Sequence, residues 1–139
     1  MKLSNYYFVI LILLAAASVQ AQVVVIANKS VSESSISSGK LNDIYSLRLK
    51  TWSNGSTIVP VTLKSDNDDV QKFFGSIGKS NMEMKKLWMK IQLTGEGQPP
   101  VGVGSEDDVL SKVASTPGAI GFISADKVNS SVKVLFTIK

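Results

Sequence analysis

The stretch "STPGAIGFISADKV", Ser115 to Val128, decides the fold of this chain. Pro117 cannot continue a helix, and Gly118 supplies the backbone conformation that a tight turn needs. A mainly apolar strand, Ala119 to Ser124, follows this turn, and Gly121 within it lets a neighbouring element approach closely. A helix, a sharp turn and a buried strand in this order predict the central strand of a layered α/β domain.

Predicted strands and helices alternate along the rest of the chain. Runs of β-branched and apolar residues predict further strands over residues 22–27, 58–63 and 132–138, with Pro60 near an edge or a strand start. Apolar residues at helical spacing predict helices over residues 41–48, 66–77, 80–91 and 105–113. The third of these begins at a capping box formed by Ser80 and Glu83. Residues 93–104, rich in Gly and Pro, are predicted to be a loop.

Residues 1–21 have the pattern of a secretory signal peptide. Lys2 supplies the positive start, an apolar run covers residues 6–17, and small residues precede a cleavage point after Ala21. The mature chain is then a single domain, residues 22–139, located in the periplasm or secreted. An uncleaved membrane anchor is the alternative, although the run is short for a bilayer span. No later segment is apolar enough to span a membrane.

The composition excludes several classes of chemistry. The 139 residues include no histidine and no cysteine, so disulfides, Ser-His-Asp and Cys-His catalysis and zinc sites are excluded. A Ser-Lys pair could act without histidine, but no spacing singles one out. The formal charge of +4 falls to +3 when Lys2 is removed, which is no nucleic-acid signature. We therefore expect neither an enzyme nor a cofactor.

Aspartates near residue 66 could suggest calcium. Asp66, Asp68 and Asp69 lie within four residues of one another, as acidic ligands at the start of an EF-hand-like loop do. Such a loop needs an oxygen ligand at its fifth position and glycine at its sixth, where this chain has Val70 and Gln71. We therefore predict no metal site.

Three stretches resemble the phosphate-binding proteins of ABC transporters, in the same order along the chain. "KLNDIYSLRLKTWSNGSTIVPV" (40–61) is similar to their Leu-x-x-Ile-Phe-x-Gly-Lys-x-x-x-Trp pattern before a strand, and "STPGAIGFISADKV" is similar to their Thr-Pro-Gly-Ser-Ile-Gly-Tyr signature. "GKSNMEMKKLWMKIQLTGEGQPP" (78–100) resembles short, single-lobe members of the periplasmic binding-protein superfamily. The resemblance implies a three-layer α/β/α single lobe of a type II periplasmic binding protein, exported and non-catalytic.

The resemblance also implies where phosphate would bind. Two-lobed relatives hold it between the lobes with an Arg and a Gly-Ser-Gly-Thr type loop at a helix start, where free N–H groups favour anions. The equivalent stretch here is "LKSDNDDVQKFF" (63–74), in which Lys64 stands at the Arg position and Ser65 fits the pattern. Asn67-Asp68-Asp69 replaces the small residues, and these carboxylates would repel phosphate. The alternative is that these residues bind no ligand and only stabilise the helix, by capping its first turn and by interacting favourably with its dipole.

A serine-rich loop after the first strand is the second candidate site. Relatives turn this loop towards the ligand side of the sheet, and the hydroxyls of Ser30, Ser32, Ser34 and Ser35 could donate hydrogen bonds to a ligand. The alternative is that these serines are solvated loop residues.

Two functions follow from the resemblance. The first is a solute-binding-like module that binds phosphate or another small anion weakly, since a lone lobe lacks the opposite wall that a second copy or a transporter partner would supply. The second is an envelope protein-interaction module that kept the fold and lost the ligand site.

Overall fold

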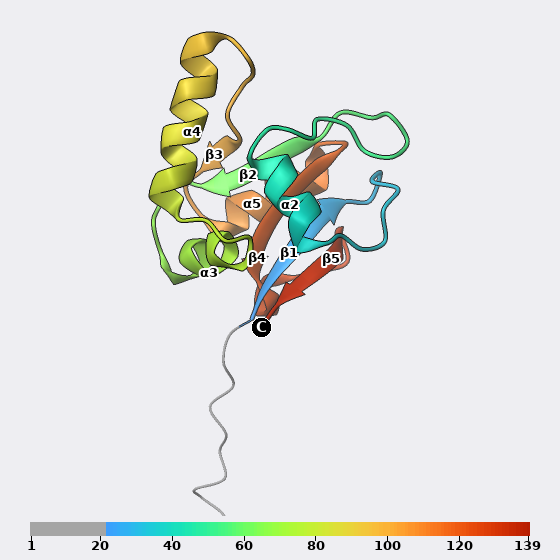
Figure 1. The fold of residues 1–139 in the computed structure, drawn as a ribbon. Coiled ribbons are helices and arrows are strands. Elements are labelled where there is room, and N and C mark those ends of the chain that lie inside the picture. The colour runs from blue at the N-terminus through green and yellow to red at the C-terminus, as the bar shows by residue number, and fades with distance from the viewer. Residues whose placement is uncertain (1–21) are drawn as a thin grey trace, which may run out of the picture.

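The computed structural model describes residues 22–139 (Figure 1), so the predicted signal peptide lies outside the described residues. The strands are β1 (Val23–Asn28), β2 (Val59–Leu63), β3 (Val101–Val103), β4 (Ala119–Ser124) and β5 (Val132–Ile138). The helices are α2 (Ser38–Tyr45), α3 (Asp68–Ser76), α4 (Asn81–Thr94) and α5 (Glu106–Ser115), with a short 3₁₀ helix, η1 (Ala125–Lys127).

The strands form one mixed sheet in the order β3-β2-β4-β1-β5. β2 runs parallel to β3 and β4, whereas β1 runs antiparallel to β4 and β5. The prediction that Ala119–Ser124 is the central strand is confirmed. Because β2, β3 and β4 point the same way, their carboxyl ends meet at one edge of the sheet.

Helices cover both faces of this sheet (Figure 1). On one face, α5 packs so closely that a Cβ atom at Gly121 would lie 2.7 Å from the Cγ1 atom of Val109. On the other face, Tyr45 of α2 and Phe73 of α3 pack against Phe122, and the Phe73 and Phe122 rings stack with centroids 4.0 Å apart. The predicted three-layer α/β/α fold is therefore confirmed.

The turn at Gly118 joins three distant segments. Gly118 has φ 77°, and a Cβ atom there would lie 2.1 Å from the carbonyl oxygen of Thr57. Its carbonyl oxygen accepts a hydrogen bond of 2.9 Å from Trp52 Nε1, and its N–H donates one of 3.0 Å to Ser30 Oγ. The turn thus requires glycine both for its backbone conformation and for space.

Two predicted boundaries are wrong. The predicted loop 93–104 contains the last residues of α4 and the edge strand β3, whose three residues pair with Val61 to Leu63. So short a strand has no sequence period of its own and forms because β2 offers an open edge. The first predicted helix ends at Tyr45, before Arg48, and Leu47 adopts a positive φ of 63°. Arg48 instead pairs with Asp43 at 2.7 Å.

Between residues 22 and 139, no helix combines the length and the apolar character needed to cross a membrane.

Candidate functional site

The carboxyl ends of β2, β3 and β4 lie at the same edge of the sheet as the first turns of α3 and α5. Each helix is capped there: Asn67 Oδ1 accepts from the N–H of Val70 at 2.9 Å, and Ser105 Oγ accepts from the N–H of Asp108 at 3.1 Å. In α/β proteins, strand ends and helix N-termini of this kind are where ligands bind, and the free N–H groups favour anions. This edge is the candidate site.

Carboxylates fill the candidate site. We call Asp68 and Asp69 of α3, with Glu106, Asp107 and Asp108 of α5, the acidic edge; all five lie in the first turns of the two helices. They match the helix dipoles, which stabilises the helices, and they place negative charge where an oxyanion would have to enter.

Glu106 is the best-anchored side chain of the acidic edge. Its Oε1 atom accepts a hydrogen bond of 3.1 Å from the N–H of Ser124, and Lys127 Nζ lies 3.9 Å from its Oε2 atom. Burial, together with the hydrogen bond and negative charge of Asp69, raises the pKa of Glu106 to about 7, although Ser124 and Lys127 oppose the shift. Near neutral pH Glu106 therefore keeps its proton more readily than a free carboxyl group does, and its contact with Asp69 links the start of α5 to the start of α3.

Lys64 and Ser65, predicted as anion-binding residues, lie at this same edge, directly after β2. Both are exposed. The N–H of Lys64 donates to the carbonyl oxygen of Val103 at 2.9 Å, and its side chain runs over Gly102, where a Cβ atom would meet Lys64 Cγ at 3.2 Å. The lysine is thus placed over β3 by the sheet, and its role in binding stays a prediction.

The serine loop lies at the opposite end of the sheet. Because β1 is antiparallel to β4, the loop that follows Asn28 sits beside the start of β4. Ser30 binds the Gly118 turn, and the Ser32 hydroxyl lies 3.1 Å from that of Ser53. The side chains of all four predicted serines, Ser30, Ser32, Ser34 and Ser35, are exposed. The structure does not bring this loop together with Lys64 and Ser65, so the two predicted sets cannot form one site.

Glu33, which the sequence did not single out, holds the serine loop in place. Its Oε1 atom accepts a hydrogen bond of 2.9 Å from the N–H of Ser53, and Lys40 Nζ lies 3.7 Å away. Burial alone would raise the pKa of Glu33, but the hydrogen bonds from Ser53 and the charge of Lys40 outweigh it and lower the pKa to about 2. A single glutamate among serines carries no sequence signal for such a role.

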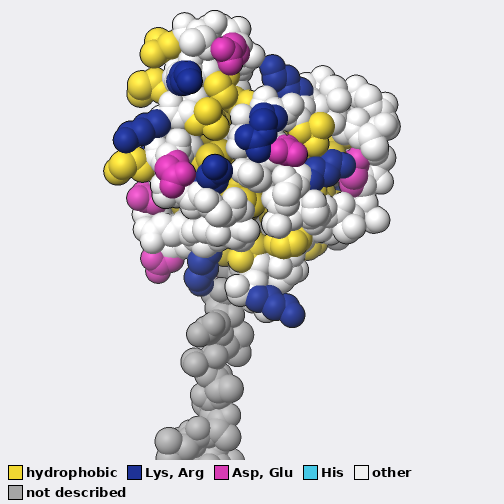
Figure 2. All heavy atoms as spheres, viewed as in Figure 1, with side chains coloured by type: hydrophobic (Ala, Val, Ile, Leu, Met, Phe, Trp, Pro, Cys, Tyr) yellow, Lys and Arg dark blue, Asp and Glu magenta, His cyan; other side chains and the backbone are white. Residues whose placement is uncertain are grey.

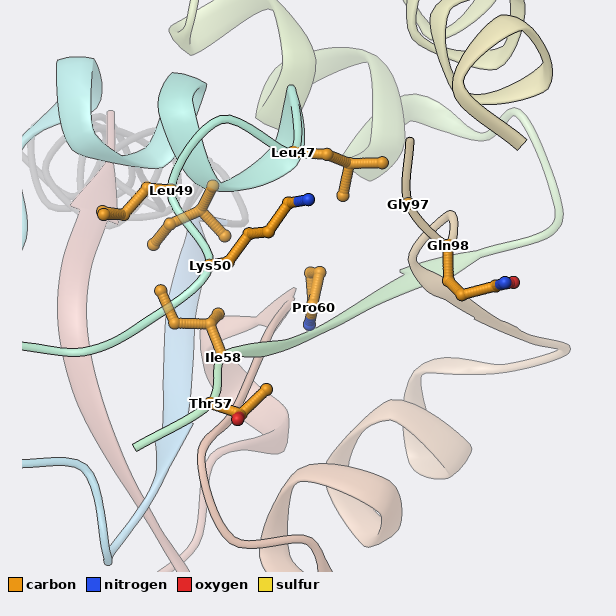
Figure 3. Close-up of a pocket in the computed structure, with 9 residues that line it drawn as sticks. Leu47, Leu49, Lys50, Thr57, Ile58, Pro60, Gly97 and Gln98 are labelled. Atoms are coloured by element: carbon orange, nitrogen blue, oxygen red, sulfur yellow. The ribbon is translucent and has the colours of Figure 1, made fainter. Parts of the chain in front are cut away.

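An apolar pocket of about 200 Å³ lies between the end of α2, the start of β2 and the loop after α4. Leu47, Leu49, Ile58 and Pro60 form much of its wall, and Lys50 extends along it between Leu47 and Pro60 (Figure 3). Lys50 Nζ donates a hydrogen bond of 3.0 Å to the carbonyl oxygen of Glu96. With walls that are mostly hydrocarbon, the pocket offers little chemistry for a polar solute.

No group of three or more His, Cys, Asp or Glu side chains in the described part of the chain is arranged to hold a metal ion.

Solved structures share this fold. A protein from Clostridium perfringens, assigned as a phosphate ABC transporter substrate-binding protein and solved with bound phosphate, superposes with a TM-score of 0.67 at 19% identity, over 83% of this chain and 44% of that one. An ABC-type phosphate transport receptor from Vibrio cholerae gives 0.62 at 20% identity, over 83% and 45%. PstS from Borrelia burgdorferi gives 0.60 at 17% identity, over 83% and 46%.

The sequence matches no protein-family model and no curated protein, so the likeness is one of fold. The chain spans less than half the length of the three proteins described above. The resemblance predicted from the sequence is therefore confirmed for the fold. The chain has the fold of a single lobe of the phosphate-binding proteins of ABC transporters.

Proposed function

We propose that this chain is an exported, non-catalytic binding module that has lost the phosphate site of its structural relatives and acts through contacts with a partner in the cell envelope. One observation carries the proposal: carboxyl groups from the first turns of two helices, Asp69 of α3 and Glu106 of α5, lie against each other where these helices begin. An oxyanion needs hydrogen-bond donors and positive charge at such a point, and here carboxyl groups occupy it.

The open surface at the acidic edge supports the same proposal. A solute-binding protein encloses its ligand by closing two lobes, which excludes water and strengthens each polar contact. The superposition covers 44% and 45% of two such proteins, which corresponds to one lobe. The acidic edge is an open surface on which Lys64, an exposed lysine without the planar fork of arginine, would have to hold a hydrated anion.

Titration calorimetry with phosphate tests the proposal. The wild type should give no binding heat at millimolar phosphate. The variant Asp68→Gly/Asp69→Ser removes two carboxyl groups from the start of α3 and should gain weak binding, with a dissociation constant on the order of millimolar. It should also lose roughly 0.3–1 kcal/mol of stability for each acid removed from the helix start.

A third protein supplies the control for this titration. Adding Lys64→Gln to the double variant should abolish the gained binding, because Lys64 is the cation that the predicted site provides. Tight phosphate binding by the wild type would overturn the proposal and direct attention to the serine loop, Ser30 to Ser35.

A further inference from the structure

The outward face of α4 carries three large apolar side chains. Met82, Met89 and Leu93 are 68%, 63% and 81% exposed. At about 100° per residue, their positions fall within about 40° of one another on the helix surface. They lie on the side away from Met84 and Trp88, which are buried in the core. We call Met82, Met89 and Leu93 the α4 stripe.

Lysines border the α4 stripe on both sides. Lys85 flanks it on one side, and Lys86 and Lys90 flank it on the other; all three are exposed. Yellow apolar and dark blue basic side chains alternate over the region of α4 in Figure 2. The only acid within α4, Glu83, is engaged at the helix start, where its Oε1 atom lies 3.3 Å from Ser80 Oγ. The exposed face of this helix is thus apolar and positively charged.

The side chains of this face are adaptable. Met82, Met89, Lys85 and Lys86 surround a shallow hollow of about 220 Å³, which Asp66 and Asn81 complete. Methionine is unbranched and conforms to its surroundings, and lysine can lay its hydrocarbon stem along apolar material while its ammonium group stays at a polar boundary. Such a surface suits a fluid, negatively charged boundary better than a rigid complementary pocket.

A second copy of the chain fits this face poorly. A symmetric dimer that buried the α4 stripe would bring Lys85, Lys86 and Lys90 of one copy near the same lysines of the other, and like charges at an interface oppose association. Anionic lipid headgroups above an apolar layer match both the lysines and the stripe.

We infer that α4 docks on an anionic lipid surface, with its axis in the plane of the bilayer. The 14 residues of α4 would lie along about 21 Å of that surface. The α4 stripe would enter the boundary between headgroups and acyl chains, and the lysines would pair with lipid phosphates. Lipid docking by α4 is independent of the fate of the phosphate site, because the α4 stripe and the acidic edge share no residue.

Vesicle co-sedimentation of the purified full chain tests this inference. Vesicles of equal parts phosphatidylglycerol and phosphatidylcholine should bind the wild type, and vesicles of phosphatidylcholine alone should bind it roughly tenfold less. Raising the salt concentration from about 0.05 M to about 0.5 M should weaken the binding strongly, because it screens the lysines.

Two triple variants separate the apolar and the charged contributions. Met82→Gln/Met89→Gln/Leu93→Gln and Lys85→Gln/Lys86→Gln/Lys90→Gln should each lower the partition coefficient roughly tenfold. Glutamine is a good helix former, so the helix should persist, as circular dichroism can verify. The matched control, Lys29→Gln/Lys112→Gln/Lys139→Gln, removes the same charge elsewhere and should bind as the wild type does. All variants carry the same N-terminal residues, so a difference between them reports on α4.

Three results would overturn the inference. The first is a wild type that ignores anionic vesicles. The second is a control variant that loses as much binding as the lysine variant of α4, which would make the effect one of net charge. The third is a wild-type dimer in sedimentation equilibrium that the apolar variant converts to a monomer, which would assign the face to a second copy.

Discussion

At the scale of single residues, Gly118 meets both a conformational and a steric requirement. Its N–H and carbonyl groups bind Ser30, Trp52 and Val59, which come from two segments far from it in the sequence, the serine loop and residues 52–59. Its φ of 77° disfavours any residue with a side chain, and the Thr57 carbonyl oxygen occupies the position of a Cβ atom. One residue therefore fixes how the serine loop and the 52–57 turn meet β4.

Replacing Gly118 by Val should destabilise the fold by at least about 2 kcal/mol, because the strained φ and the clash with Thr57 add. Urea unfolding followed by tryptophan fluorescence measures the change. Gly39→Ala is the matched control: Gly39 lies in α2 without a positive φ, with free space around its Cβ position. That variant should be unchanged or slightly more stable. Equal stability of the Val variant and the wild type would show that the turn has another geometry.

At the scale of elements, the pair of Asp69 and Glu106 joins α3 and α5, which otherwise pack on opposite faces of the sheet. The contact forms at the one edge where both helices begin. Its strength depends on a proton, since two ionised carboxylates would repel each other.

This dependence predicts how stability changes with pH. Because folding raises the pKa of Glu106 to about 7, the folded state binds the proton more tightly than the unfolded state. The stabilisation is therefore complete below the unfolded pKa, about 4.5, and is lost as the pH rises through about 7. Glu106→Gln should remove this slope and be more stable than the wild type at pH 8, as urea titrations from pH 5 to pH 8 can measure. Asp108→Asn, in the same helix turn, should keep the slope, and a Gln variant with an unchanged slope would contradict the prediction.

At the scale of the whole molecule, two glutamates at opposite ends of the sheet respond to pH in opposite directions. Glu33, at the serine loop, has a pKa lowered to about 2, so its stabilisation is present above the unfolded value and is lost as the pH falls. Glu106, at the acidic edge, loses its stabilisation as the pH rises. The serine loop is therefore destabilised by acid, and the acidic edge is destabilised as the pH rises above neutral.

The fold should consequently be most stable at a mildly acidic pH, near about 4.5. Melting temperatures recorded from pH 2.5 to pH 8.5 should rise and then fall. Glu33→Gln should flatten the acid side of this curve and leave the neutral side as it is, whereas Glu106→Gln should do the reverse. A melting temperature that rises steadily up to pH 8 would contradict the assignment of Glu106.

The sequence by itself determined the order of most elements, the central strand and the turn before it. These features depend on local chemistry: the conformational limits of Pro117 and Gly118, the capping of helix starts, and the period of apolar residues. The sequence also showed that Asp68 and Asp69 depart from the pattern of the phosphate-binding proteins, because a change of residue type is visible without a structure.

Only the tertiary structure decided what lies together. The antiparallel direction of β1 separated the serine loop from Lys64, and the common direction of β2 and β3 brought Glu106, which follows β3, to Asp69, which follows β2. Pairing with β2 also made residues 101–103 a strand, and the packing of the chain left one face of α4 uncovered. Strand direction, pairing between distant segments and the burial of a charge are set by the whole chain at once, and no local pattern of residues encodes them.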